Sequence, residues 1–201
     1  NRDNLKDDMW GYNRYTKQTV NIGSAFLQNE WKNEKWSILL GGRLDKHNLI
    51  NHVIFSPRAN LRFNPSEDIN LRLSYSSGFR APQAFDEDLH IENVGGTVSM
   101  IERAKNLKEE KSQSFSASAD MYHRFGAFQV NFLVEGFYTR LSDVFVLENI
   151  GERDGILIKE RRNGSGAKVL GLSMEGKMAY LSLFQLQAGV TLQQSRYDEP
   201  E

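Results

Sequence analysis

The residues with the clearest chemical capacity in this chain are a histidine and three carboxylates in one polar stretch. Asp86, Glu87 and Asp88 stand just before His90. Carboxylates and imidazole can bind a cation or transfer protons, but such a run in a connection is more often a solvated acidic surface. No serine, histidine and acid are spaced as a catalytic triad, and no glycine-rich loop would hold a phosphate. The sequence therefore predicts no enzyme, no catalytic residue and no metal site.

Arginines form the second set of candidates, because they recur at the polar positions of alternating segments. Guanidinium groups bind carboxylates and other anions through paired hydrogen bonds. The competing interpretation is that they are hydrated or salt-bridged wall residues, since exposed ion pairs contribute little free energy. The candidate binding residues are Arg43, Arg58, Arg72 and Arg80.

The segment that carries two of these arginines shows which element must position them. From Ile69 to Phe79, apolar and polar residues alternate, with Leu71, Leu73 and Tyr75 opposed by Arg72 and by asparagine and serines. A period of two places alternate side chains on opposite faces of a β-strand. One face of this strand therefore meets an apolar phase, and the other meets water.

The same alternation recurs along the chain, and its connections alternate in length. Tight turns are predicted near 32–35, 64–68, 126 and 182, and long loops near 46–52, 80–111 and 142–166. Residues 1–19 are expected to form a solvent-facing loop, and the β-prone pieces 144–147 and 156–158 to extend their flanking strands. An antiparallel up-and-down sheet would then carry all tight turns on one rim and all long loops on the other, as a transmembrane β-barrel does.

Aromatic residues are placed where such a barrel needs them. Rings at a common height are typical of the boundary between hydrocarbon and headgroups, so two levels of rings predict one apolar band between two interfaces. The level beside the tight turns consists of Trp31, Trp36, Phe63, Phe125, Phe128, Tyr180 and Phe184. The level toward the long loops consists of Phe55, Tyr75, Phe79, Phe115, Tyr138 and Tyr197.

Composition limits the other classes of protein. The 201 residues suffice for one domain, and a formal net charge of −1 without a basic segment gives no reason to expect nucleic acid. The absence of cysteine excludes a disulfide-stapled module. No apolar run reaches the roughly 18–20 residues that a spanning helix needs. Because the chain begins at Asn1 without methionine or signal peptide, we expect a processed product or a piece of a longer protein.

Two other architectures share the periodicity. Soluble β-sandwiches, for example a carbohydrate-binding or surface module, have equally apolar inner faces. A small structural or adhesion barrel, such as a porin or an autotransporter translocator, would also alternate. Long strands and polar faces rich in Ser, Asn, Gln and Arg favour a membrane barrel over a sandwich. A complete small barrel should end in an aromatic residue, whereas this chain ends AspGluProGlu.

Seven short motifs, in order along the chain, resemble the β-barrel of TonB-dependent outer-membrane transporters. The most specific is GlyPheArgAlaPro, formed by Gly78, Phe79, Arg80, Ala81 and Pro82, and the others lie at 28–32, 41–45, 55–61, 106–112, 137–143 and 170–176. Each motif alone is weak, whereas the ordered set covers nearly the whole chain from Val20 to Tyr197. Glu109 stands where the family usually has proline, which we interpret as variation in a loop.

The resemblance implies an all-β antiparallel meander, a middle portion of a barrel of about 22 strands, to which this chain contributes about eight to ten. The family's plug domain, energy-coupling box and final strands have no counterpart here. Complete members take up a scarce large solute, such as an iron–siderophore complex, haem, cobalamin or a glycan, across the Gram-negative outer membrane. This chain would then supply barrel wall and part of the extracellular vestibule, and would not transport alone. The implied partners are outer-membrane lipid, the protein's own plug domain, the inner-membrane energy-coupling complex and the solute.

The resemblance also assigns expected roles to the candidate residues. Arg80 belongs to the GlyPheArgAlaPro motif and is expected to be structural. Arg43, Arg58 and Arg72 would line the lumen, opposite plug carboxylates or an anionic solute. His90 lies where haem-transporting members place a ligating histidine, although a lone histidine in a long loop is usually a surface residue. Apart from a transported ligand of this kind, no cofactor is expected.

Overall fold

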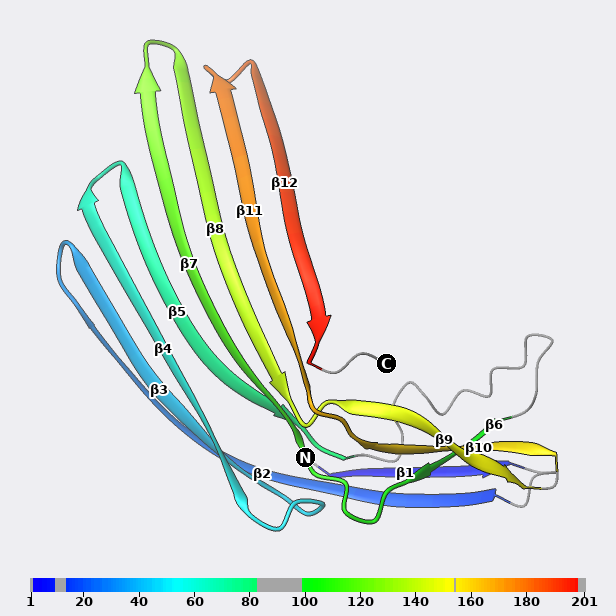
Figure 1. The fold of residues 1–201 in the computed structure, drawn as a ribbon. Helices are drawn as coiled ribbons and strands as arrows, with labels where there is room; N and C mark the ends of the chain where they lie inside the picture. Colours follow the sequence, from blue (N-terminus) through cyan, green and yellow to red (C-terminus); the bar gives the residue numbers. More distant parts are fainter. Residues whose placement is uncertain (1, 10–13, 83–98, 154, 199–201) are drawn as a thin grey trace.

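The computed structural model describes residues 2–9, 14–82, 99–153 and 155–198 (Figure 1). These residues form twelve strands and no helix that is long and apolar enough to cross a membrane. The strands are β1 (Arg2–Met9), β2 (Arg14–Lys32), β3 (Trp36–His47), β4 (Val53–Ser66), β5 (Ile69–Arg80), β6 (Ser99–Arg103), β7 (Glu110–Phe125), β8 (Phe128–Ser142), β9 (Phe145–Arg153), β10 (Ile156–Asn163), β11 (Gly166–Tyr180) and β12 (Phe184–Tyr197).

Nine of the strands form one sheet in the order β1-β2-β3-β4-β5-β7-β8-β11-β12. Every neighbouring pair is antiparallel. Figure 1 shows this sheet curved into an open trough rather than closed on itself. The predicted fold class, an antiparallel meander that is a partial barrel, is confirmed, and nine strands lie within the expected range.

The connections divide between two rims of the trough. Residues 33–35, 67–68, 126–127 and 181–183 connect strands at one rim, at the upper edge of Figure 1, which we call the tight-turn rim. Gly126 and Leu181 adopt φ values of 57° and 47° there, the left-handed region that such short turns need. The connections from β3 to β4, β5 to β7 and β8 to β11 lie at the opposite edge, the long-loop rim.

Two expectations about the connections were wrong. Residues 2–9 and 14–19 are not a loop, because β1 pairs with the first part of β2, from Arg2 opposite Asn21 to Met9 opposite Arg14. The pieces 144–147 and 156–158 do not extend their flanking strands. They belong to β9 and β10, which pair with each other and, through β10, with β6 in a separate three-stranded sheet at the long-loop rim. Asp143, at φ 55°, turns the chain between β8 and β9.

Strict alternation gives the large sheet one apolar and one polar face. Residues directly opposite each other on neighbouring strands share a face, so the register extends each face from strand to strand. The polar positions are the more buried set, as expected where side chains converge on the concave side of a curved sheet. Adjacent residues show the contrast, since Leu44 is 49% exposed and Asp45 is 2% exposed.

The apolar face has no counterpart to pack against in the described residues. Large apolar side chains such as Leu27, Phe55 and Leu192 are 82%, 60% and 62% exposed. The buried hydrophobic cluster is small, consists of Ile50, Ile54 and Ala81 with Phe79 packed against it, and lies at the long-loop rim. The architecture is therefore the reverse of a soluble domain, because apolar residues cover the outside and polar residues line the concavity.

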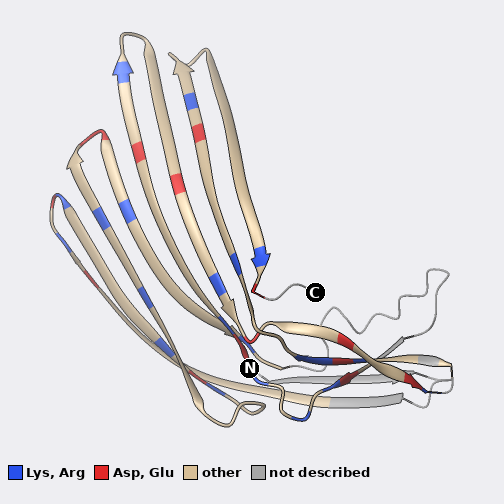
Figure 2. Cartoon of the chain, viewed as in Figure 1, with Lys and Arg blue, Asp and Glu red and all other residues tan. Residues whose placement is uncertain are grey.

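Charge follows the same division. In the described parts of β2–β5, β7, β8, β11 and β12, the apolar face between the two aromatic levels contains no Asp, Glu, Lys or Arg. The charged residues that Figure 2 shows along these strands between the aromatic levels belong to the polar face.

Aromatic rings form cross-strand contacts on the apolar face. At the tight-turn rim, Trp36 stacks on Phe63 with ring centroids 4.1 Å apart. Phe128 contacts Phe125 at 5.5 Å and Tyr180 at 4.8 Å, and Tyr180 contacts Phe184 at 5.9 Å. Trp31 lies opposite Ile38 on the same face.

The second aromatic level is only partly as expected. Tyr75 and Phe115 pair at 4.7 Å on the apolar face. Tyr197, however, lies opposite Ala167, at odd spacing from Leu192, and so belongs to the polar face with Gln193 and Ser195. Its inclusion in the apolar-face level was wrong, because β12 reaches its last residue out of phase with that face.

Two glycines of β11, Gly171 on the polar face and Gly176 on the apolar face, test how closely neighbouring side chains pack on the sheet. A Cβ on Gly171 would collide with the Phe137 ring and with the Leu192 carbonyl oxygen at 2.8 Å, whereas a Cβ on Gly176 would meet nothing within 4 Å. In the complete protein refolded in detergent, we expect Gly171→Ala to lower the free energy of unfolding by about 1–3 kcal/mol. Gly176→Ala should be neutral or slightly stabilising. Urea unfolding measured by tryptophan fluorescence checks both, and equal effects of the two variants would contradict the packing described.

Candidate functional site

The polar face of β3, β4 and β5 carries most of the arginines singled out from the sequence. Arg43 lies opposite Ser56, and Arg58 lies opposite Ser76. Together with Phe26 and Asn60, these residues line an open groove along the sheet. The strand period places them on one face because their positions on each strand are an even number of residues apart.

Arg43 is held by a carboxylate rather than left open to a ligand. Its Nε donates to Asp45 Oδ2 at 2.7 Å, and Ser24 Oγ donates to Asp45 Oδ1 at 2.6 Å. Asp45 is 2% exposed, so its carboxylate is shielded from water where it accepts the hydrogen bond from Arg43. The Arg43 side chain is 54% exposed, so it lies at the open edge of the groove.

Arg62 and Arg72 form an unusual like-charged pair nearer the tight-turn rim. They stand directly opposite each other on β4 and β5, an arrangement that costs free energy when nothing neutralises it. Arg72 Nε donates to Asn70 Oδ1 at 2.7 Å, a neutral acceptor. Arg62 Nε is buried without a hydrogen-bond partner among the described residues. The sequence-based selection omitted Arg62, although it alternates in phase with Arg58.

Arg80 has a different environment from the other arginines. Its guanidinium carbon lies 5.1 Å from the centre of the Phe145 ring, and that of Arg161 lies 5.8 Å from the same ring. Phe145 begins β9, so this cation–π contact joins β5 to the three-stranded sheet. The structural role expected for Arg80 stays a prediction. The rest of its motif ends β5, with Ala81 in the small hydrophobic cluster.

The other half of the polar face carries three carboxylates, a feature that the sequence reading did not single out. Asp120 on β7, Glu135 on β8 and Glu175 on β11 share this face. Figure 2 shows red segments among blue ones along β7, β8 and β11. Asp120 accepts hydrogen bonds from Tyr122 and Asn131, and Glu175 pairs with Lys177 at 2.7 Å. The signal was available, because each carboxylate occupies a polar position of an alternating strand.

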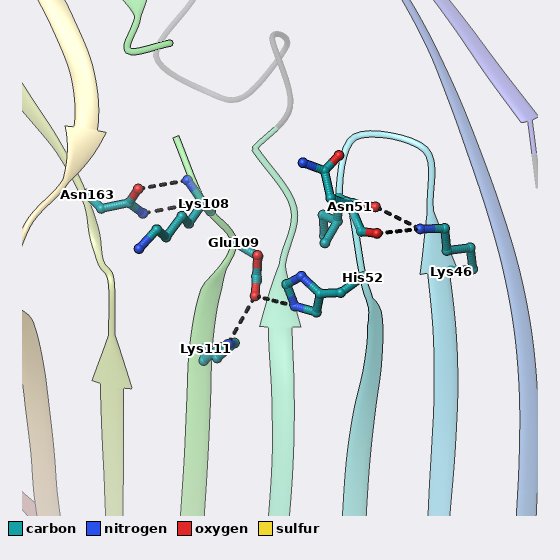
Figure 3. Close-up of polar contacts among 8 residues, drawn as sticks. Lys46, Asn51, His52, Lys108, Glu109, Lys111 and Asn163 are labelled. Carbon is teal, nitrogen blue, oxygen red and sulfur yellow. Dashed lines mark hydrogen bonds and ion pairs between the residues drawn. The ribbon is translucent and has the colours of Figure 1, made fainter. Parts of the chain in front are cut away.

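At the long-loop rim, Glu109 ties together two connections (Figure 3). Its Oε1 lies 3.1 Å from His52 Nε2 and 3.0 Å from Lys111 Nζ, and its side chain is 6% exposed. Burial by itself raises the pKa of Glu109, but its own backbone N–H, the ammonium of Lys111 and the charge of His52 outweigh burial and hold the pKa below the ordinary carboxyl value. Glu109 lies in the connection before β7, as expected, and it makes contacts there that the sequence did not indicate.

Asn163 makes a second tie at the same rim (Figure 3). Its amide Nδ2 donates to the carbonyl oxygens of Asp143 at 2.7 Å and Lys108 at 3.2 Å, and its Oδ1 accepts from the Lys108 N–H at 2.8 Å. One side chain thus joins the end of β10 to the segments before β7 and after β8. We call the contacts of Glu109 and Asn163 the rim latch.

Part of the predicted set falls outside this description. His90 and the acidic run Asp86, Glu87 and Asp88 lie outside the described residues. Within the described residues, no group of three or more histidine, aspartate and glutamate side chains could hold a metal ion.

A curved meander with an uncharged outer face between two aromatic levels defines the class of transmembrane β-barrel walls. The family model for the TonB dependent receptor-like β-barrel matches residues 1–200. The chain belongs to this family.

Solved structures agree in fold. The siderophore receptor PirA from Pseudomonas aeruginosa matches 92% of this chain and 36% of its own length, with a TM-score of 0.74 and 17% identity. A G324V mutant of the ferric enterobactin receptor PfeA from the same species matches 91% of this chain and 28% of its own, with a TM-score of 0.67 and 18% identity. The outer membrane transporter YddB from Escherichia coli matches 92% and 26%, with a TM-score of 0.68 and 14% identity.

The chain thus spans about a third of these structures or less. The expected recognition as a segment of a TonB-dependent barrel is confirmed. A search of curated proteins finds no match.

The rim latch predicts a measurable coupling between the connections. In the complete protein, Glu109→Gln should speed hydrogen exchange of amides in residues 48–52 and 104–109 about fivefold, since it removes roughly 1 kcal/mol from contacts whose partners are half exposed. Lys108→Gln is the matched control, because the latch uses only the backbone of Lys108. Hydrogen-exchange mass spectrometry measures both variants. Exchange rates in Glu109→Gln identical to those of the wild type would contradict the rim latch.

The latch should also open in acid. Because the pKa of Glu109 is depressed in the folded chain, its contribution is present above the ordinary carboxyl pKa and is lost as the pH falls through the lower folded value. Exchange of the same amides, relative to the intrinsic rate at each pH, should therefore rise in the wild type as the pH falls below the ordinary carboxyl pKa. In Glu109→Gln this additional rise should be missing, and a rise of equal size would assign the acid effect to other carboxylates.

Proposed function

We propose that this chain is the wall and part of the extracellular vestibule of a receptor that takes up a scarce large solute, a ferric siderophore in the first instance, across the Gram-negative outer membrane. The wall would close around a plug domain supplied elsewhere in the complete protein, and uptake would be driven by an energy-coupling complex of the inner membrane. The segment alone would not transport.

The observation that carries the proposal is the uncharged outer band. On β8 the aromatic levels are marked by Phe128 and Tyr138, and on β7 by Phe125 and Phe115, ten residues apart in each strand. At about 3.3 Å per residue this is about 33 Å along the strand. With a strand tilt of about 40° the height is about 25 Å, the height of the apolar band of outer-membrane barrels.

The ferric siderophore is favoured over the other solutes by two considerations. Two of the solved neighbours named above are a siderophore receptor and a ferric enterobactin receptor. The groove along β3–β5 is lined by Arg43 and Arg58, which suits an anionic complex. Arg58 is exposed there, and Arg72 is exposed outside the groove, nearer the tight-turn rim on the same face. Three other expectations stay predictions: haem binding through His90, uptake of cobalamin or a glycan, and pairing of the arginines with plug carboxylates.

The alternatives predict different behaviour in a direct test. The gene for the complete receptor is deleted in a host starved of iron, and uptake of radiolabelled ferric siderophores is measured with and without a protonophore. The proposal expects energy-dependent uptake of at least one siderophore, lost on deletion and restored by the wild-type gene. Passive, energy-independent diffusion would identify a porin. A complete protein that stays monomeric in buffer without detergent would identify a soluble sandwich.

The basic groove gives the matching variant test. Arg58→Gln combined with Arg72→Gln should weaken siderophore binding about tenfold or more, as expected for loss of a charged hydrogen bond worth roughly 1.5–3 kcal/mol. Arg124→Gln, near the tight-turn rim of β7, removes a charge of the same sign far from the groove and should leave affinity unchanged. Binding is measured by tryptophan quenching of the purified receptor, and unchanged affinity in the double variant would show that these arginines do not contact the solute.

A further inference from the structure

The sequence contains a single Asn-Gly pair, Asn163–Gly164, and it lies in the rim latch (Figure 3). An asparagine side chain can be attacked by the backbone nitrogen of the residue that follows it, and glycine hinders that attack least because it has no Cβ. Every other asparagine of the chain is followed by a residue with a side chain. Asn163 is therefore the asparagine whose sequence context most favours loss of the side-chain amide.

The folded rim holds both reacting groups in hydrogen bonds. The Gly164 N–H donates to the Val144 carbonyl oxygen at 2.7 Å. The Asn163 amide donates to the carbonyl oxygens of Asp143 and Lys108 and accepts from the Lys108 N–H. Ring closure between Gly164 and Asn163 has to break the first bond and to turn the amide away from the other three. The reaction therefore requires local opening of the rim.

The structure also shows why this reactive pair stands at the rim. A Cβ on Gly164 would lie 3.0 Å from Val146 Cγ1, so a side chain there would require Val146 to move. At position 163 the latch uses two N–H donors and one acceptor oxygen of a short side chain, a combination that the asparagine amide provides. Packing selects the glycine and hydrogen bonding selects the asparagine.

Loss of the Asn163 amide would break the latch from within. A carboxylate at this position has no N–H to donate. Its oxygens would instead face the carbonyl oxygens of Asp143 and Lys108, which now accept from the amide. Both carbonyls would lose their partner, and acceptor would stand against acceptor. The segments before β7 and after β8 would then no longer be joined to the end of β10.

We propose that Asn163 is a site of spontaneous deamidation and that the rim latch sets its rate. When the rim opens, the Gly164 backbone nitrogen bonds to Asn163 Cγ, the Cγ–Nδ2 bond breaks, and Nδ2 leaves as ammonia with the proton of the Gly164 N–H. Water then opens the succinimide ring at either carbonyl, which leaves an aspartate or an isoaspartate at position 163. The product cannot form the latch again. This inference goes beyond the proposed function and holds whichever solute is taken up.

The test incubates the complete receptor in detergent at neutral pH. Peptide mass spectrometry follows the conversion of amide to acid, and labelling by an isoaspartyl methyltransferase detects the isoaspartate. We expect conversion at Asn163 to be about tenfold or more slower in the folded receptor than in the receptor unfolded in guanidinium chloride, because several hydrogen bonds must open together. Asn149, which is exposed on β9 and followed by Ile150, is the internal control and should stay intact.

Three variants link the reaction to the latch. Glu109→Gln should speed conversion in the folded receptor about fivefold, the same factor as for amide exchange, because it loosens the segment that holds the Asn163 amide. Lys108→Gln is the matched control and should leave the rate unchanged, since Asn163 contacts only the backbone of Lys108. Asn163→Asp supplies the product directly and should speed hydrogen exchange in residues 104–109 as ageing of the wild type does.

Three outcomes would overturn the proposal. Equal rates of conversion in the folded and the unfolded receptor would show that the latch gives Asn163 no protection. An intact Asn163 in folded wild type and folded Glu109→Gln, at a time when the unfolded receptor is fully converted, would show that the rim does not open far enough for reaction. Hydrogen exchange in Asn163→Asp equal to that of the fresh wild type would show that the product leaves the latch closed.

Discussion

The structure depends on one constraint, which is that an apolar surface must meet an apolar phase while every backbone amide beside it stays hydrogen-bonded. In hydrocarbon no water is available for an unpaired N–H or C=O, so strands survive there only when each has a neighbour on both sides. The nine-stranded ladder satisfies its interior strands in this way. The same constraint explains why the outer band carries no charge and why the buried hydrophobic cluster is small. Lipid takes the place of a protein core against the apolar face.

The polar face of the sheet must instead be in contact with water or polar groups. Water or a polar occupant must solvate it, and arginines predominate on β3–β5 whereas carboxylates and cations are mixed on β7, β8 and β11. Some of these charges are satisfied within the wall, as Arg43 is by Asp45. Others, above all the opposed Arg62 and Arg72, leave positive charge directed at whatever fills the concavity. Positive charge on the polar face is therefore concentrated on β3–β5 by the sequence and register of the wall itself.

The rim where the long connections meet is organised by a few polar side chains. Glu109 and Asn163 join segments that are far apart in the sequence, and the Phe145 ring lies beside both Arg80 and Arg161. Such contacts hold the long-loop rim of the wall in one arrangement while the strands below are held by their ladders. Local order at this rim therefore depends on charged and amide side chains, whereas the band below depends on lipid.

The sequence predicts those features of the fold and of the candidate site that depend on residues close together in the chain. The alternation from Ile69 to Phe79, the unequal connections and the aromatic levels are properties of sequence periodicity, so fold class and membrane-facing surface were accessible without coordinates. The sequence also placed Arg58 and Arg72 on one face, since face is fixed by parity along a strand. Register is different, because it depends on which residues of two strands meet. Only the tertiary structure therefore showed that Arg62 lies opposite Arg72 and that Tyr197 lies on the polar face. The pairing of β1 with β2 at the start of the chain likewise appeared only in the structure. The separate sheet of β6, β10 and β9 and the partners of Glu109 join residues tens of positions apart, and no periodicity encodes such contacts.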